Sequence, residues 1–443
     1  MKEKLSVGQI VSVSLALFAM FFGAGNMIFP PMIGHLGGDS FVSGTMGFVV
    51  TDAGLSVIGI AAIVFAGSRL DDIGRQIGPK FSVFLGLLVY FLIGPLFALP
   101  RTGTVSYEMA VLPFMNNGGS MAASVIFTAV FFGVTYLLCA NPSKIVDIVG
   151  KILTPILLIS IAVIFVVSLI NPVGEISAPE GDYATIPFFK GFVEGYLALD
   201  GLAALAFGIV VITSIRNMGV KSDTGVARYT LLSGVFAGLG LAVVYLMLAY
   251  VGAQTSGEEF SFSNGGELLA AVVNMQMGKA GNIVLGLAVL MACLTTAIGL
   301  ATSFADYISE LRPAWSYKKV LAAVCLFSFA VSNIGLTTMI SITLPALVMI
   351  YPPVVVLVLL TFLRKFINGK KEVYVLAMVM AFIVGIFDGL KNAGITEGAA
   401  FDFMSEYIPF FDLGVGWVIP ALVGAVIGML PFIRFMNHEQ KKR

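Results

Sequence analysis

Long apolar segments determine what this chain can fold into. Charged residues make up 11% of the 443 residues, against about 25% in a soluble domain, and the mean hydropathy is +0.99. A helix that crosses a membrane needs about 20 mostly apolar residues. The sequence holds about twelve such segments, at 6–32, 42–67, 79–110, 121–140, 146–170, 188–215, 226–253, 281–308, 319–333, 336–363, 373–391 and 414–435. We therefore predict an all-α polytopic membrane protein with about twelve transmembrane helices.

The basic residues indicate the orientation of these helices. With a cytoplasmic N-terminus and alternating segments, 21 of the 25 Lys and Arg residues fall on the cytoplasmic side. Cytoplasmic loops carry an excess of Lys and Arg, so both termini are predicted to be cytoplasmic. The start of the chain resembles a signal peptide, but the apolar run continues through Met27 to Phe29 without a small-residue cleavage site. This continuation favours a retained first helix.

Composition argues against several classes of function. The formal net charge is zero, so no nucleic-acid partner is expected. The three cysteines lie in apolar segments, and neither histidine has a metal-ligand partner at useful spacing, which indicates no disulfide framework and no zinc site. A membrane enzyme would need clustered His, Cys or acidic residues at one membrane face, and none is found. The sequence also indicates no obligate protein partner.

The first apolar segment is interrupted near its middle. The stretch MFFGAGNMIFPP places Gly23, Gly25 and Asn26 where a helix should be regular. Non-helical backbone is tolerated at membrane depth only where protein buries it or where it lines a water-filled cavity. Small residues in a membrane helix also mark close helix–helix contacts. On this stretch alone, packing remains the alternative to a binding site.

The sixth segment carries a matching interruption. Asp200 lies inside an apolar segment, flanked by Gly195 and Gly201. Ionisable residues at this depth are costly and usually face a cavity or a partner. Segments one and six are five apart, so two five-helix halves would be inverted relative to each other, and paired interrupted helices indicate a transporter binding site. Unwinding exposes amides that attract an anion and carbonyls that attract a cation.

The eighth segment offers oxygen ligands for a cation. Thr295 and Thr296 place adjacent hydroxyls in mid-helix, and Ala292 precedes them by three and four residues, so its carbonyl lies on the same face. Such oxygen ligands suit a hard cation such as sodium. The alternative is that each threonine hydroxyl bonds to a carbonyl of its own helix.

These residues resemble a known family. The run FAMFFGAGNMIFPP and the region from Tyr196 to Gly201 look like those of the branched-chain amino acid:cation symporters, the bacterial system II carriers, and the resemblance covers essentially the whole chain. It implies the amino acid–polyamine–organocation superfamily and the leucine-transporter fold, an inverted repeat of five plus five helices with helices 1 and 6 broken. The implied divisions are 1–170 for the first repeat, 171–363 for the second, and 364–443 for two additional helices and a tail.

The resemblance also implies roles for single residues. The expected substrate-binding residues are Gly23, Ala24, Gly25, Asn26, Tyr196, Leu199 and Asp200. The expected sodium ligands are the carbonyls of Ala19, Phe22 and Ala292 and the hydroxyls of Thr295 and Thr296. For Asp200 three roles stay open: binding the substrate ammonium, tuning a second ion site, or replacing one.

The predicted function is import of leucine, isoleucine and valine through a bacterial inner membrane by sodium-coupled symport, with sodium as coupling ion and no cofactor. The few charges near the midplane, Asp52, Glu194 and Asp200, suit a net-neutral zwitterion with an apolar side chain. Proton coupling through Asp200 is the main alternative, and a channel is a more distant one. Arg101 is expected to pair with Glu108, and Asp388 is expected to be solvated near a helix end.

Overall fold

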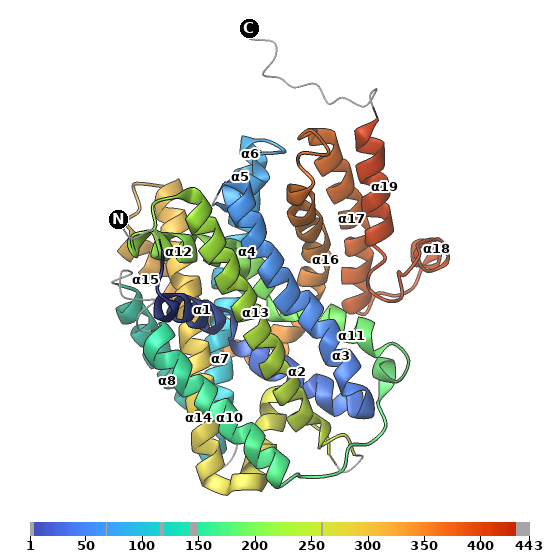
Figure 1. The fold of residues 1–443 in the computed structure, drawn as a ribbon. Helices are drawn as coiled ribbons and strands as arrows, with labels where there is room; N and C mark the ends of the chain where they lie inside the picture. The colour runs from blue at the N-terminus through green and yellow to red at the C-terminus, as the bar shows by residue number, and fades with distance from the viewer. Residues whose placement is uncertain (1–3, 68, 116–118, 141–148, 258–259, 431–443) are drawn as a thin grey trace.

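A computed structural model describes the chain except for residues 1–3, 68, 116–118, 141–148, 258–259 and 431–443. The described residues form helices joined by turns and loops, and no strand is found among them (Figure 1). Ten of their helical stretches are long and apolar enough to cross a membrane, and Val7–Phe21 and Val418–Met429 are shorter apolar helices. The prediction of an all-α polytopic membrane protein is confirmed. The start of predicted segment 146–170 and the end of segment 414–435 lie outside the described residues.

The helices follow the predicted segments in order. Segments one to five correspond to α1 Val7–Phe21 and α2 Ala24–Gly37, α3 Phe41–Val49 and α4 Leu55–Ala66, α6 Pro79–Phe91 and α7 Ala98–Ala110, α8 Met121–Cys139, and α10 Thr154–Ile170. Segments six to ten correspond to α11 Pro187–Glu194 and α12 Asp200–Asn217, α13 Asp223–Ala253, α14 Gly265–Leu311, α15 Tyr317–Val331 and α16 Leu336–Phe362. The last two segments are α17 Lys371–Asn392 and α19 Val418–Met429, and the short helices α5 Leu70–Gly74 and α18 Ala399–Tyr407 lie between segments.

The predicted break in the first segment separates α1 from α2. Ser6 begins α1 as an N-cap, with its side chain accepting from the Gln9 amide. The helix ends at Phe21, because the Phe22 backbone (ψ 86°) and the Gly23 backbone (ψ −154°) leave the helical region. Gly23 then caps α2. The interruption therefore creates one helix C-terminus and one helix N-terminus inside the protein.

The sixth segment is broken in the same way. After α11 the chain makes a 3₁₀ turn, Gly195–Ala198, and Leu199 adopts the left-handed region with φ 75°. A leucine in this region is strained, and such strain persists where the surrounding structure enforces it. Asp200 is the first residue of α12, so its carboxyl group lies at a helix N-terminus.

Smaller irregularities interrupt other spans. A π-helical turn at Val50–Gly54 joins α3 to α4, and another at Leu92–Leu96 joins α6 to α7, where Gly94 leaves the helical region beside Pro95. Proline cannot donate a helical hydrogen bond, which explains the second break. The start of α14 falls within the predicted loop 254–280, and Gly278 (φ 59°) kinks this helix.

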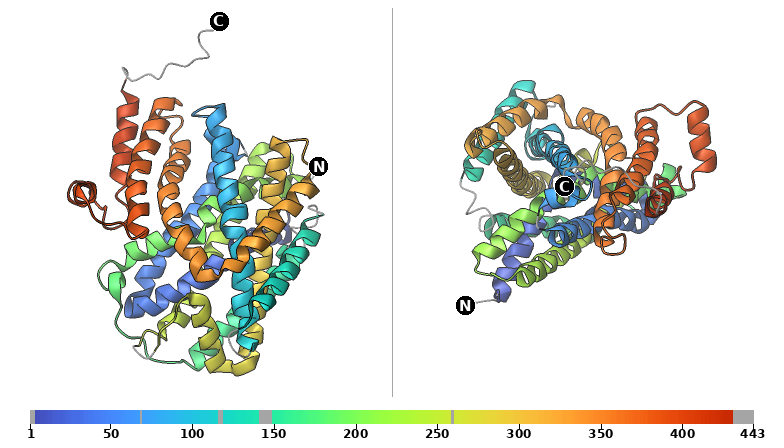
Figure 2. Two further views of the ribbon diagram at one scale, coloured as in Figure 1. Left: turned by 180° about the vertical axis from the view of Figure 1, so that it is seen from behind. Right: turned by 90° about the horizontal axis from the view of Figure 1, so that it is seen from above.

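Each of the two broken segments packs closely along one other helix. Helix α2 packs along α13 (Figure 1), and α12 packs along α4. Glycines allow close contact in both pairs: a Cβ at Gly252 of α13 would overlap with the Pro31 carbonyl of α2, and a Cβ at Gly59 of α4 would lie 2.9 Å from the Ala204 Cβ of α12. Helices α16, α17 and α19 form a row at one side of the bundle, and α18 projects away from it (Figures 1 and 2).

We expect Gly252→Ala to destabilise the protein. The added methyl group would push α13 away from α2, and overpacking of this kind costs about 1–3 kcal/mol. The melting temperature of the purified protein in detergent should fall by several degrees. Gly133→Ala in α8 is the matched control, because nothing lies within 4 Å of a Cβ at that position. Equal melting temperatures for the two variants would contradict the predicted contact.

Candidate substrate and ion site

Both glycines of the first break are required by space. A Cβ at Gly23 would lie 2.6 Å from the Thr296 Oγ1, and a Cβ at Gly25 would lie 2.8 Å from the Arg101 Nη2 and 3.0 Å from the Ala198 Cα. Helix α2 therefore begins in contact with α14, with α7 and with the break in the sixth segment. Three other elements therefore meet at this break, whereas a packing motif between two helices would involve only one neighbour.

The first turn of α2 presents backbone amides at this point. Ala24, Gly25 and Asn26 are its first three residues, and the first amides of a helix have no intrahelical partner. The Asn26 side chain folds back, so that its Oδ1 accepts a hydrogen bond of 2.9 Å from the Gly23 amide. The positive end of the helix dipole and these amides form an environment that attracts a carboxylate.

The Arg101 side chain of α7 binds backbone carbonyls at the break in the sixth segment. Its Nη1 donates to the Leu197 carbonyl at 2.7 Å, and its Nη2 donates to the Ala198 carbonyl at 3.1 Å. The side chain is buried. The expected pairing of Arg101 with Glu108 is wrong, because the Glu108 carboxylate instead accepts from the Leu336 amide at 3.1 Å. Arg101 thus places a positive charge beside the α2 amides.

Asp200 takes part in a buried polar cluster with residues from three other helical segments. The Asn26 Nδ2 donates to the Asp200 Oδ2 at 2.6 Å and lies 3.3 Å from the Asp52 Oδ2. The Tyr245 hydroxyl of α13 donates to the Asp52 Oδ2 and accepts from Asn26. All four residues are buried. The cluster joins the two broken segments to each other.

Tyr196 and Leu199 lie in the break itself. The Tyr196 ring packs against the Tyr351 ring of α16, with centroids 4.7 Å apart, and against Phe192. Leu199 is buried and faces the same small cavity as Ala24, Gly25 and Asp200. Of the seven residues predicted to bind substrate, six border this cavity and Tyr196 does not.

The predicted ion ligands meet between α1 and α14. The Thr295 hydroxyl lies 2.7 Å from the Ala19 carbonyl and 2.9 Å from the Ala292 carbonyl. The Thr296 hydroxyl lies 2.9 Å from the Met20 carbonyl and 3.4 Å from the Ala19 carbonyl. The Thr295 hydroxyl thus contacts its own helix as well as the first segment, whereas the contacts of the Thr296 hydroxyl are with the first segment.

Phe22 is the one predicted ion ligand without such a contact. Its ring stacks on the Phe18 ring, with centroids 5.4 Å apart, and its carbonyl has no hydrogen bond to another described residue. Met20 supplies the second α1 carbonyl beside the threonines. The difference arises because α1 remains helical up to Phe21, one residue before Phe22.

The space between these groups is nearly closed. The cavity measures about 10 Å³, which holds about one water molecule. Its lining combines the polar groups above with small and apolar residues, namely Met20, Phe21, Ala98, Thr102, Ala198, Ala203 and Leu300. An amino acid would require the walls to separate before it could enter.

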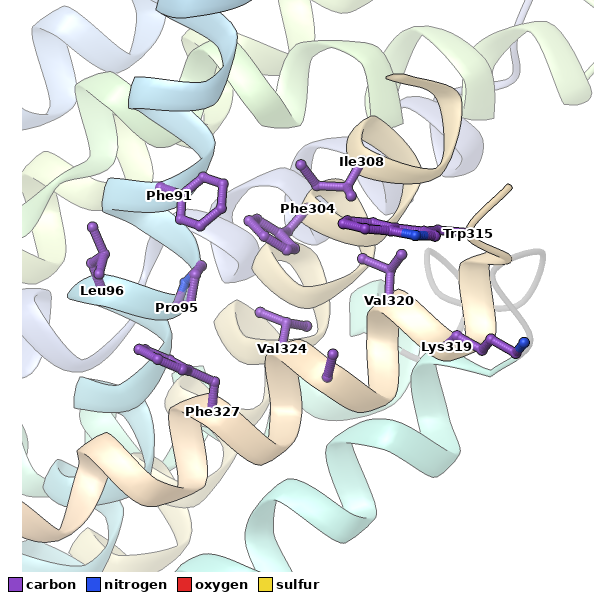
Figure 3. A pocket seen from close by; sticks show the side chains of 11 residues that line it. Phe91, Pro95, Leu96, Phe304, Ile308, Trp315, Lys319, Val320, Val324 and Phe327 are labelled. Carbon is purple, nitrogen blue, oxygen red and sulfur yellow. The ribbon is translucent and has the colours of Figure 1, made fainter. Parts of the chain in front are cut away.

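A larger groove lies elsewhere and has different chemistry. It measures about 520 Å³ and is lined by Phe91, Pro95, Phe304, Trp315, Lys319 and six aliphatic or aromatic neighbours from the region of the α6–α7 junction, α14 and α15 (Figure 3). Its described lining contains no carboxylate, and the ammonium of Lys319 points away from the apolar side chains (Figure 3). This groove does not suit a zwitterion.

Sequence reasoning assigns no site role to three residues that lie here, namely Asp52, Arg101 and Tyr245. In the sequence, Asp52 is a charge within the second segment and Arg101 is a cation within the third. A lone charge within a span is the signal that could have found both. Tyr245 carries no comparable signal. Asp388 is a further correction, since it is buried in α17 with 3% of its surface exposed.

Comparisons with known proteins agree over almost the whole chain. The family described as Branched-chain amino acid transport protein matches residues 6–434. The branched-chain amino acid permease BrnQ of Bacillus subtilis (strain 168) is 42% identical over 431 residues, covering 97% of this chain and 98% of the relative. The branched-chain amino acid transport system 2 carrier protein of Pseudomonas aeruginosa is 38% identical over 422 residues, covering 95% of each chain.

A solved structure shares the fold. Mhp1, a nucleobase-cation-symport-1 family transporter in a closed conformation with bromovinylhydantoin bound, superimposes with a TM-score of 0.61. The match covers 95% of this chain and 91% of that chain at 14% identity. Because the identity is this low, the likeness concerns the arrangement of helices and not the ligand.

Proposed function

The chain belongs to the branched-chain amino acid transport protein family, and from this premise we propose that it imports leucine, isoleucine and valine into a bacterial cell by sodium-coupled symport. Membership of this family makes the chain a membrane carrier and not an enzyme. The observation that carries the proposal is the meeting of both helix breaks with Thr295 and Thr296 in one buried place. Unpaired backbone amides at one helix end carry a partial positive charge there, and unpaired carbonyls at another helix end carry a partial negative charge.

A zwitterionic amino acid matches these partial charges. Its carboxylate would accept hydrogen bonds from the amides of Ala24, Gly25 and Asn26, with the Arg101 guanidinium nearby. Its ammonium would face the carbonyl groups that the end of α1 leaves without helical partners. The apolar side chain would lie against Met20, Phe21 and Leu300. Since one methylene changes binding by about 1–3 kcal/mol, overlapping affinity for leucine, isoleucine and valine is expected.

The sodium site is proposed between α1 and α14. The carbonyls of Ala19 and Ala292 and the hydroxyls of Thr295 and Thr296 already converge there, and oxygen ligands suit a hard cation. A rotation of the backbone at Phe22 would bring its carbonyl in, and Met20 is the alternative fifth ligand. Sodium bound there would hold the two helices together and stabilise the start of α2.

Transport would follow from opening the closed cavity to one side at a time. We assign 1–170 and 171–363 to the two inverted repeats and 364–443 to the additional helices and tail, with both termini cytoplasmic. The similar packing of α2 with α13 and of α12 with α4 supports this division. One sodium ion contributes about 2.3 kcal/mol per 100 mV of membrane potential, and a tenfold sodium gradient adds about 1.4 kcal/mol. Together they would permit accumulation of several hundredfold.

The proposal is tested by uptake into vesicles that contain the purified protein. Tritiated leucine should rise above its external concentration when the outside holds sodium, and not when choline replaces sodium. Excess valine or isoleucine should compete. Equal uptake in choline would exclude sodium coupling, and accumulation that follows an imposed proton gradient without sodium would establish the proton-coupled alternative.

The role of the α2 amides gives a separate prediction. Ala24→Pro removes one amide hydrogen, while proline is tolerated at the first position of a helix and Gly23 before it is already extended. We expect the apparent leucine affinity to fall about tenfold, the equivalent of one hydrogen bond of about 1.4 kcal/mol. Met121→Pro is the matched control, because Met121 is the exposed first residue of α8. If the Ala24→Pro variant has the wild-type affinity for leucine, the break in the first segment serves helix packing and not substrate binding.

A further inference from the structure

Two carboxyl groups from different segments face the same donors. Asp52 comes from the π-helical turn between α3 and α4, and Asp200 is the first residue of α12. The Oδ2 of each lies within hydrogen-bond distance of the Asn26 Nδ2 and of the Tyr245 hydroxyl, which is 3.5 Å from the Asp200 Oδ2. Because both Oδ2 atoms contact the same Asn26 Nδ2 atom, at 3.3 Å and 2.6 Å, the two carboxyl groups are close neighbours. Two ionised carboxylates in this position would repel each other strongly.

The available donors leave part of this pair unsatisfied. Asn26 has two amide hydrogens and Tyr245 has one hydroxyl hydrogen, and one of the Asn26 hydrogens is directed to the Tyr245 oxygen. The Asp52 Oδ1 is fully buried and has no hydrogen-bond partner among the described residues. Buried polar atoms are nearly always paired. The Asp52 Oδ1 is therefore an oxygen at which the pair can bind a proton.

The surrounding charges lead to the same conclusion. Arg101 of α7 is the charged group that faces the pair, and the pair's other titratable neighbours among the described residues are Tyr245 of α13 and Tyr351 of α16, whose hydroxyls are uncharged at neutral pH. Two carboxylates and one guanidinium carry a net charge of −1. Buried charge without compensation is costly, and one monovalent cation restores neutrality.

The orientation of Asn26 favours a proton over a metal cation. Its Oδ1 accepts from the Gly23 amide, so its NH2 group must face the two carboxyl groups. An Asn amide is oriented correctly when its hydrogen-bond network requires that orientation. A sodium ion bound at the two carboxyl groups would need a further oxygen ligand, but the Asn26 amide hydrogens occupy that position. A proton needs only the carboxyl oxygens.

We propose that Asp52 and Asp200 share one proton in this closed arrangement, and that the protein takes up this proton when leucine binds. The proton comes from solvent and is bound by one of the two carboxyl groups, which is then neutral. The inference rests on the proposed function, because closure of α2 and α12 around the substrate is what brings the two carboxyl groups together.

The test is the pH dependence of leucine binding to the purified protein in detergent at saturating sodium, measured with tritiated leucine from pH 5.5 to 9. If binding takes up one proton, the wild-type Kd should rise by up to tenfold per pH unit where the free protein has lost the proton and the complex retains it. In Asp52→Asn the amide reproduces the protonated state, so Kd should stay within about threefold over the whole range. A flat wild-type profile, or a wild-type slope in Asp52→Asn, would overturn the proposal.

Two further variants keep this test interpretable. Asp388→Asn also replaces a buried aspartate, one with an unpartnered Oδ2 among the described residues, and should retain the wild-type slope. If Asp52→Asn does not fold, Tyr245→Phe removes a donor to Asp52 and should move the rise in Kd to higher pH, whereas an unmoved rise contradicts the proposal. Sodium-independent leucine binding at every pH would mean that the proposed function fails; sodium-dependent binding that ignores pH would mean that the shared proton alone fails.

Discussion

Thr295→Val should lower the apparent sodium affinity of leucine uptake by about 10- to 100-fold. Valine has nearly the same shape as threonine but no hydroxyl, and the Thr295 hydroxyl lies between the carbonyls of Ala19 and Ala292. A hydrogen bond or equivalent contact to a charged group contributes about 1.5–3 kcal/mol, which corresponds to this range. The maximal rate at saturating sodium should change much less. The measurement is leucine uptake into vesicles as a function of external sodium.

Thr343→Val provides the matched control for this prediction. Thr343 is also a buried threonine in a membrane helix, but its hydroxyl bonds to the Met339 carbonyl of its own helix α16. Its substitution should leave the sodium dependence unchanged. If Thr295→Val and Thr343→Val have the same sodium dependence as the wild type, the ion does not bind between α1 and α14.

Arg101→Gln should reduce leucine uptake by about 100-fold or more. The guanidinium binds the carbonyls of Leu197 and Ala198 at the sixth-segment break and is the charge that faces Asp52 and Asp200. Removing one partner from a buried set of charges costs about 3–5 kcal/mol. Arg101→Lys keeps the charge but loses the two-pronged geometry of the guanidinium, so it should recover part of the lost uptake.

The control for Arg101 is an arginine on the surface. Arg216 forms an ion pair with Asp223 at 2.6 Å, and both side chains are largely exposed. Exposed ion pairs contribute about 0–1 kcal/mol, so Arg216→Gln should retain uptake within a few-fold. Uptake should be compared at equal amounts of protein in the membrane. Near-normal uptake by Arg101→Gln would remove Arg101 from the site.

The helices and their breaks could be predicted from local sequence. Apolar length determines a membrane span, and the clusters around Gly23 and Asp200 interrupt that pattern within a few residues. The structure confirms both breaks. The glycines at the first break are explained by contacts with Thr296 and Arg101, which are distant in sequence. Local pattern therefore indicated where the backbone is unusual but not what it contacts.

Partners across the bundle could not be predicted in the same way. Arg101 is expected to pair with Glu108 in the same predicted segment, whereas the structure brings Arg101 to carbonyls nearly a hundred residues away. Tyr245 looks like any aromatic residue in an apolar helix until the packing of α13 places its hydroxyl beside Asp52. Which carbonyls of the first segment face Thr295 and Thr296 depends on the residue at which α1 ends, and helix ends are the least reliable part of a sequence-based prediction.

The central claim is that sodium and leucine cross the membrane together through the site between the two helix breaks. The most direct test is uptake of ²²Na⁺ into vesicles containing the wild-type protein, measured with and without external leucine. Leucine should stimulate ²²Na⁺ entry several-fold, valine should do the same, and Thr295→Val at the same sodium concentration should abolish most of the stimulation. Leucine uptake without any leucine-stimulated ²²Na⁺ entry would contradict the account.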